Sequence, residues 1–159
     1  MKFRVMKTEV FVDTIEALGA KATPLPYPEV YTSIKTGVVD GAENNWPSYE
    51  SSSHYEVAPY YTLDMHSIVP EILCVSKKLW DSLSDEEKKI FRDAGKASES
   101  VMRKAWEDRV KKSKKIVIEA GVQIFEVDNS SFAAKIGPVY KKYLTPEAQK
   151  YLKRIFLMP

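Results

Sequence analysis

The densest group of side chains suited to binding chemistry lies in the stretch ENNW, residues 43 to 46. Asn44 and Asn45 each offer hydrogen-bond donors and an acceptor, so they can bind hydroxyl or carboxylate oxygens. Trp46 offers a flat apolar face that suits a sugar ring or an alkyl chain. Together these residue types predict a binding site for a small polar molecule.

Two other residues are candidates for the same site. Arg4 is the only arginine among the first ninety residues and lies in a predicted strand. A single arginine on such a strand can clamp a carboxylate through two parallel hydrogen bonds, although a surface arginine that packs its stem is the plainer alternative. Tyr27 ends another extended segment and has a similar mixed apolar and polar character.

Catalysis has little support in the residue pattern. Asp40 and Glu43 could form an acid–base pair, but a turn beside Gly41 explains them more simply. The two histidines and the single cysteine do not have the spacing of zinc ligands. Nucleotide-binding and nucleophile motifs do not occur. We therefore predict a protein that is no enzyme and has neither a metal nor a cofactor, with an enzyme using the two carboxylates as the remote alternative.

The composition is that of an ordinary globular domain. The chain has 159 residues, 44% apolar and 29% charged, with a net charge of +2. No basic run is long enough to indicate nucleic-acid binding, and we interpret KKSKK at 111–115 as a solvated helix face. One cysteine allows no internal disulfide, and Cys74 is predicted to be a small buried core residue. No apolar stretch approaches the ~18 residues of a membrane span.

Strand-like and helical patterns alternate through the first third of the chain. The predicted elements are strand 2–6, helix 9–18 capped by Thr8, extended segment 22–27, helix 28–37, strand 38–43 and a helix from Pro47 to about Tyr55. This alternation is typical of βαβ units with parallel strands. Ligands of open α/β sheets bind beyond the carboxyl ends of the strands, which is where residues 43–46 fall.

A long helix dominates the second half. Ser84 and Glu87 form a capping box, and the helical pattern then continues over 85–120, a length of roughly 50 Å. Such a helix exceeds a compact domain of ~30 Å, so it either projects or lies across two lobes. The other predicted elements are one or two extended segments in 60–76 bent at Pro70, strand 122–127 and helices 131–144 and 146–156.

Several short motifs occur together at a specific spacing. They are RV at 4–5, LGA at 18–20, TPLP at 23–26, EVY at 29–31, TGVVDGAEN at 36–44 and YEV at 55–57. In this combination the chain closely resembles the solute-binding proteins of tripartite ATP-independent periplasmic (TRAP) transporters, the DctP-like family. The resemblance covers essentially the whole chain. It implies a receptor that binds an organic acid in a cleft between two α/β lobes and delivers it to membrane permease subunits.

The resemblance also implies roles for individual residues. Arg4 matches the family's carboxylate-clamping arginine and Asn44 its cleft asparagine, while Tyr27 and His66 match positions that line the cleft. The variant ENNWPSYES is similar to the branch that binds sugar acids such as hexuronates, with C4-dicarboxylates as the alternative ligands. Asn45 and Trp46 would then contact sugar hydroxyls and the ring face. The implied location is periplasmic or extracytoplasmic, although this chain opens without a signal peptide.

The family pattern predicts a division of the chain. The expected parts are 1–66 as ligand-binding lobe two, 67–83 as a crossing strand and remnant of lobe one, 84–121 as the lobe-spanning helix, and 122–159 as a strand and helices returning to lobe two. Family members carry further lobe-one sequence before the first strand, so we expect lobe one to be incomplete. Apolar side chains at Ile72, Leu73, Val75 and the middle of the long helix should then be exposed. A non-binding fragment that forms a homo-oligomer through this surface is the alternative function.

Overall fold

A parallel sheet forms the centre of the N-terminal part. The computed structural model describes residues 1–156. Strand β1 (Lys2–Val5) lies between β2 (Lys21–Pro24) and β3 (Gly41–Ala42), and both neighbours are parallel to it. The register pairs Arg4 with Thr23 on one side and with Ala42 on the other. The predicted βαβ arrangement is therefore confirmed.

Helices connect these strands and cover the sheet. They are α1 (Glu9–Ala17), the short 3-10 turn η1 (Tyr27–Glu29) and α2 (Val30–Lys35), with α3 (Trp46–Ser51) and η2 (His54–Glu56) after the last strand. Val5, Val30 and Val39 are fully or almost fully buried. Because the central strand buries Val5 beside Arg4, the sheet and its helices form the rigid frame of the candidate site.

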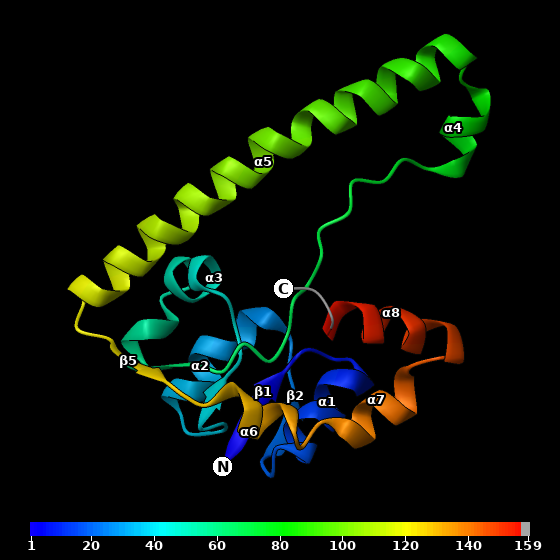
Figure 1. Cartoon of the computed structure of the whole chain (residues 1–159). Coiled ribbons are helices and arrows are strands. Elements are labelled where there is room, and N and C mark those ends of the chain that lie inside the picture. Colours follow the sequence, from blue (N-terminus) through cyan, green and yellow to red (C-terminus); the bar gives the residue numbers. More distant parts are fainter. Residues whose placement is uncertain (157–159) are drawn as a thin grey trace.

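A second, two-stranded parallel sheet links distant parts of the chain. It pairs β4 (Tyr60–Leu63) with β5 (Gln123–Glu126), and the connection between them includes α4 (Lys77–Ser82) and α5 (Asp85–Glu119). Figure 1 shows the C-terminal end of α5 beside α3, while its N-terminal end and α4 stand away from the sheets. The long helix is thus confirmed, and it projects from the α/β body.

The attachment of α5 is local. Val117 packs with Tyr49 of α3 and with Val122, and Trp46, Tyr55 and Tyr61 surround this cluster. Arg109 and Ser113 of α5 also hydrogen-bond to the carboxylate of Glu50 in α3. Among the described residues, only the C-terminal half of the helix therefore packs on the α/β body. The N-terminal half meets α4, where the guanidinium carbon of Arg92 lies 5.4 Å from the ring centre of Trp80.

The C-terminal elements return to the first sheet. Helices α6 (Asn129–Ala133), α7 (Gly137–Tyr143) and α8 (Pro146–Phe156) follow β5. Lys142 and Tyr143 of α7 both donate hydrogen bonds to the carboxylate of Asp13 in α1, each at 2.7 Å. Among residues 1–156, no helix is both long and apolar enough to cross a bilayer.

Four predictions about individual elements are wrong. Strand 38–43 shrinks to Gly41–Ala42, because the amide of Val39 hydrogen-bonds to Ser33 at the end of α2 instead of to a strand. Helix 131–144 is interrupted before Pro138, which lacks the amide hydrogen needed inside a helix and takes a position in the first turn of α7. Helix α4 was not expected; the hydroxyl of Ser76 accepts a hydrogen bond from Leu79 at its start.

The fourth concerns Cys74, which is exposed and not part of a core. It lies in residues 64–76, which follow β4 and form neither helix nor strand. Strand-like sequence becomes a strand only when another strand pairs with it, and this segment has no such neighbour among the described residues. The expected exposure of Ile72, Leu73 and Val75 is confirmed, as is that of Met102 and Trp106 in α5.

Candidate ligand-binding site

A buried arginine lies at the centre of the candidate site. The side chain of Arg4 is only 5% exposed, and its Nε donates a hydrogen bond to the carbonyl of Leu25 at 3.0 Å. Its Nη1 lies 3.7 Å from Oε1 of Glu43, which is an ion pair but too long for a hydrogen bond. Burial lowers the pKa of Arg4 while Glu43 raises it, and a guanidinium remains charged in either case.

The carboxylate of Glu43 connects this arginine to a histidine. Its Oε2 lies 3.9 Å from Nε2 of His66, and Nδ1 of the same imidazole is 2.9 Å from Oδ1 of Asp64. Arg4, Glu43, Asp64 and His66 together form what we call the charged cluster. It joins β1, the loop after β3 and the segment after β4, so its members come together only in the folded chain.

Local backbone geometry explains part of this cluster. Glu43 follows β3 directly, and the pairing of Ala42 with Arg4 brings the two charges to the same end of the sheet. Met65 between Asp64 and His66 has φ of 49°, in the left-handed region that non-glycine residues rarely adopt. The structure thus holds the imidazole beside Asp64 through an unfavourable backbone conformation.

Burial and hydrogen bonding shift the protonation of these groups. Removal from water raises the pKa of Glu43, against the opposing effects of His66 and Arg4. The hydrogen bond to Asp64 raises the pKa of His66, against the opposing effect of burial. Two carboxylates and a single permanent cation therefore share a partly desolvated volume, where charge balance depends on the imidazole.

Tyr27 borders the charged cluster. The guanidinium carbon of Arg4 lies 5.7 Å from the centre of the Tyr27 ring. The tyrosine hydroxyl donates to the carbonyl of Ser48 at 3.1 Å and lies 2.6 Å from the hydroxyl of Ser52, so it fastens η1 to α3. Buried His54 meets the same ring edge-on at 5.5 Å.

The neighbouring amides have structural contacts. Oδ1 of Asn45 caps α3 by accepting a hydrogen bond from the amide of Ser48 at 2.9 Å. Oδ1 of Asn44 accepts one from the amide of Asn45, and the Asn44 carbonyl accepts one from the Tyr61 hydroxyl at 2.7 Å. The side-chain amide oxygens thus fix the loop, and each side-chain amide group keeps further hydrogen-bonding capacity for a ligand.

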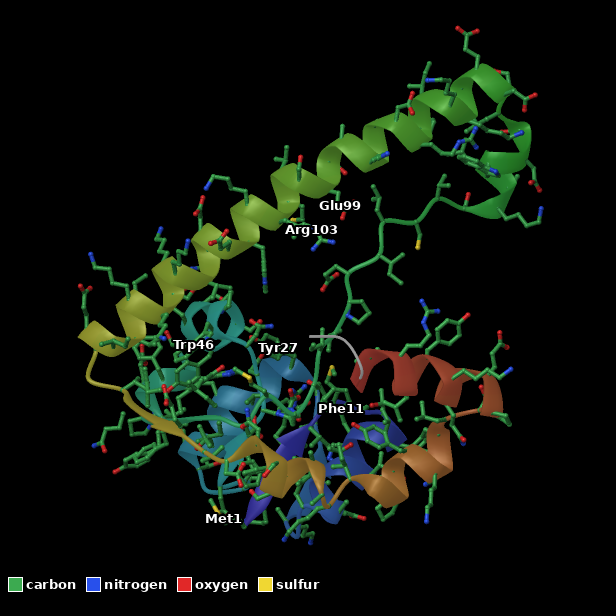
Figure 2. The ribbon with its side chains drawn as sticks, viewed as in Figure 1. Met1, Phe11, Tyr27, Trp46, Glu99 and Arg103 are labelled. Carbon is green, nitrogen blue, oxygen red and sulfur yellow. The ribbon has the colours of Figure 1, made fainter. Side chains whose placement is uncertain are left out.

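Trp46 is the first residue of α3, and its side chain lies beside Lys114 of α5. Its ring stacks on Tyr61 with centroids 4.0 Å apart, and the ammonium of Lys114 lies 5.6 Å from the ring centre. Figure 2 shows Tyr27 and Trp46 on the α/β body below α5, and Glu99 and Arg103 on the part of the helix that has left it. The binding roles of Asn45 and Trp46 stay predictions, because their observed contacts are structural.

The sequence did not point to every member of the site. Asp64 and His54 were not selected, since a single aspartate or histidine gives no local pattern. Glu43 was placed in the stretch 43–46 and considered as an acid–base partner of Asp40, but not as a partner of Arg4. Oδ2 of Asp40 accepts a hydrogen bond from the amide of Lys2, whereas Glu43 faces Arg4. The two carboxylates thus serve opposite ends of the sheet, which does not suit acid–base catalysis. Within residues 1–156, no three potential ligands are arranged around a metal position.

Comparison with known proteins identifies the family of this chain. The model of the DctP family, described as bacterial extracellular solute-binding protein, family 7, matches residues 1–146. The chain belongs to this family. It is 49% identical over 145 residues to a solute-binding protein of Chromohalobacter salexigens, an alignment that covers 91% of this chain and 43% of that protein.

Solved structures of TRAP periplasmic solute-binding proteins superpose closely. One from Sulfitobacter sp. NAS-14.1 with bound β-D-galacturonate has a TM-score of 0.87 and 53% identity, covering 94% of this chain and 51% of that one. One from Chromohalobacter salexigens with bound D-glucuronate has a TM-score of 0.91 and 47% identity, covering 98% and 52%. The chain therefore spans about half the length of these relatives, and over that half it has their fold.

Proposed function

We propose that this chain contributes the carboxylate-binding part of a TRAP transporter receptor for an organic acid. The observation that carries the proposal is the buried guanidinium of Arg4. Among the described residues its only hydrogen bond is donated by Nε, and its ion pair with Glu43 is 3.7 Å long. A carboxylate that reached the terminal nitrogens could therefore form shorter, bidentate hydrogen bonds than the protein itself supplies.

We propose a hexuronate as the ligand and C4-dicarboxylates as the less favoured alternative. The similar structures from Sulfitobacter and Chromohalobacter hold galacturonate and glucuronate, and both are close to half identical to this chain. Amide nitrogens of Asn44 and Asn45 would bind sugar hydroxyls, and Tyr27, Trp46 and His66 would line the site. In this proposal residues 1–66 form lobe two, 84–121 span the lobes, and the receptor works outside the cytoplasm with membrane permease subunits.

Calorimetric titration tests the proposal. D-Glucuronate, D-galacturonate and succinate are titrated into the chain, and into a chimera in which residues 1–146 replace the matching half of the Sulfitobacter receptor. We expect saturable binding of a hexuronate and weaker binding of succinate. Binding of succinate alone would contradict the sugar-acid assignment, and binding of no acid by a folded chimera would contradict the function.

Substitution of the arginine tests its role in binding. Loss of one partner of a desolvated charge pair costs roughly 2–5 kcal/mol, so Arg4→Ala should weaken hexuronate binding by at least about thirtyfold. Arg4→Lys should recover little, because an ammonium cannot make the bidentate contact. Circular dichroism of each variant establishes that it is folded. Unchanged affinity in folded Arg4→Ala would remove the clamp assignment.

A specific observation supports self-association as the second candidate. Ile68, Leu73 and Val101 are all more than two-thirds exposed, and they lie on the extended segment and on α5. Large apolar side chains exposed in this number favour association when they gather in one patch. Sedimentation velocity should then show concentration-dependent dimers that Leu73→Glu with Val101→Glu abolishes. A monomer at all concentrations would contradict this candidate and leave the receptor proposal intact.

A further inference from the structure

One polar atom of the charged cluster has no partner. Nε2 of His66 is buried, and it is the one buried side-chain nitrogen or oxygen among the described residues that makes no hydrogen bond. The other ring nitrogen is occupied by Asp64 at 2.9 Å. A buried polar atom without a hydrogen bond costs free energy, so Nε2 is the place where this cluster is incomplete.

The charges around the imidazole indicate which change at Nε2 would complete the charged cluster. With neutral His66, the cluster contains the cation Arg4 and the anions Glu43 and Asp64, a net charge of about minus one. The position of Glu43, 3.9 Å from Nε2, suits a proton on that nitrogen, because an imidazolium would be attracted to both carboxylates. Protonation of His66 therefore makes the cluster neutral.

The other groups close to the cluster do not supply a second cation. From β4, Tyr61 is phenolic, and burial raises its pKa further. From η2, burial and the nearby Arg4 lower the pKa of His54, which disfavours the protonated form of that imidazole. From α6, the amide nitrogen of Asn129, in its favourable orientation, donates to the carbonyls of Leu63 and Asp64. His66 is thus the group that can become a second cation beside an added negative charge.

We infer that an acid ligand held at Arg4 binds together with one proton, which His66 takes up at Nε2. The inference rests on the proposed function, because it assumes a carboxylate beside Arg4. That carboxylate would add a third negative charge within the same partly desolvated volume. A nearby opposite charge stabilises the protonated imidazole, and in proteins such an effect commonly reaches 1–3 pKa units.

The expected consequence is a pH-dependent affinity. In the ligand-free chain, the hydrogen bond to Asp64 already raises the pKa of His66, and the bound anion raises it further. Between the free and the bound pKa of His66, affinity should fall about tenfold for each unit of rising pH. Below the free pKa the proton is already present, so affinity should be independent of pH there.

Calorimetry in two buffers measures the proton directly. D-Glucuronate is titrated into the full chain at about pH 8 in phosphate and in Tris, whose ionisation enthalpies differ, so the difference in observed heat gives the protons taken up. The variants are His66→Gln, the matched histidine variant His54→Gln, and Glu43→Gln, which tests the other possible proton acceptor. Because the chain has only two histidines, proton NMR of the Hε1 ring hydrogens gives two signals that His66→Gln assigns.

The outcomes separate the inference from the function on which it rests. Proton uptake that disappears in His66→Gln and persists in His54→Gln, with a His66 signal whose pKa rises on adding glucuronate, supports the inference. Binding without proton uptake, or uptake that survives in His66→Gln and is lost in Glu43→Gln, overturns it and leaves the receptor function standing. Absence of glucuronate binding at every pH overturns both.

Discussion

The two halves of helix α5 have the same secondary structure but opposite environments. Val117 in the C-terminal half is completely buried against α3, whereas Val101 in the N-terminal half is 69% exposed. Both belong to one unbroken helix, Asp85–Glu119. The comparison teaches that the helical conformation and the packing of its apolar side chains have separate causes in this protein.

Local interactions account for the helical conformation where α5 has left the α/β body. Ser84 and Glu87 satisfy each other's backbone amides in a capping box. Five pairs of opposite charge follow at i,i+4 spacing; they are Lys89–Asp93, Arg103–Glu99, Lys104–Asp108, Lys111–Glu107 and Lys115–Glu119. Each such pair stabilises a helix by about 0.2–0.5 kcal/mol. The helix can therefore persist where apolar contacts end.

The largest expected difference between a buried and an exposed position concerns two arginines. Arg4→Ala should lower the free energy of unfolding by about 3 kcal/mol, because it leaves the buried carboxylate of Glu43 without its cation. Arg103→Ala, at a side chain 78% exposed and paired with Glu99, should change it by less than about 0.5 kcal/mol. Urea unfolding followed by tryptophan fluorescence measures both. Equal losses would mean that burial does not distinguish these charges.

Two valines in α5 test the same comparison for apolar packing. Val117→Ala removes two buried methyl groups and should lower the free energy of unfolding by about 2 kcal/mol. Val101→Ala should leave it unchanged or slightly higher, because alanine has the higher helix propensity. The control shares the helix and the chemical change, so thermal unfolding of both variants isolates the packing contribution. A similar loss at Val101 would reveal a partner for the exposed half.

The caps of α1 and α5 provide a smaller contrast. Ser84→Ala removes a side-chain cap and should cost about 1 kcal/mol. Because the adjacent half of α5 is not attached to the α/β body, this loss should appear as faster hydrogen exchange in the first turn of α5 and not as a change in global unfolding. Thr8 occupies the corresponding position of α1 without a side-chain cap bond, so Thr8→Ala should affect exchange less. Equal exchange in the two variants would contradict the role of the capping box.

The smallest expected effect is the pH dependence of the α/β body. The pKa of His66 is raised by its hydrogen bond to Asp64, so the resulting stabilisation is complete below about pH 6.5 and disappears as pH rises through the folded pKa. Burial lowers the pKa of His54, which gives the opposite dependence. The difference between the wild type and His66→Gln, measured by urea unfolding from about pH 6 to about pH 8, isolates the first effect. A constant difference across that range would show that His66 does not change protonation on folding.

Much of the fold could be predicted because its signals are local. The alternation of strands and helices, the stop at Gly37 and the capping box at Ser84 are all properties of short sequence windows. The prediction was wrong where a distant partner decides. The segment containing Cys74 has strand-like sequence, but without a pairing strand it remains extended and exposed. Pro138, which divides the predicted helix 131–144, is a local signal that the predicted helix boundaries left out.

The candidate site divides in the same way. Residue type and family resemblance pointed to Arg4, and the resemblance pointed to His66. The sequence alone determined that the N-terminal half contains one arginine and two histidines that could take part in a binding site. Only the tertiary structure decided that Glu43 and Asp64 accompany them, because the pairing of β1 with β3 and the turn at Met65 bring together groups from three separate segments. Side-chain chemistry is encoded residue by residue, but the charge of a site depends on distances that exist only after the chain has folded.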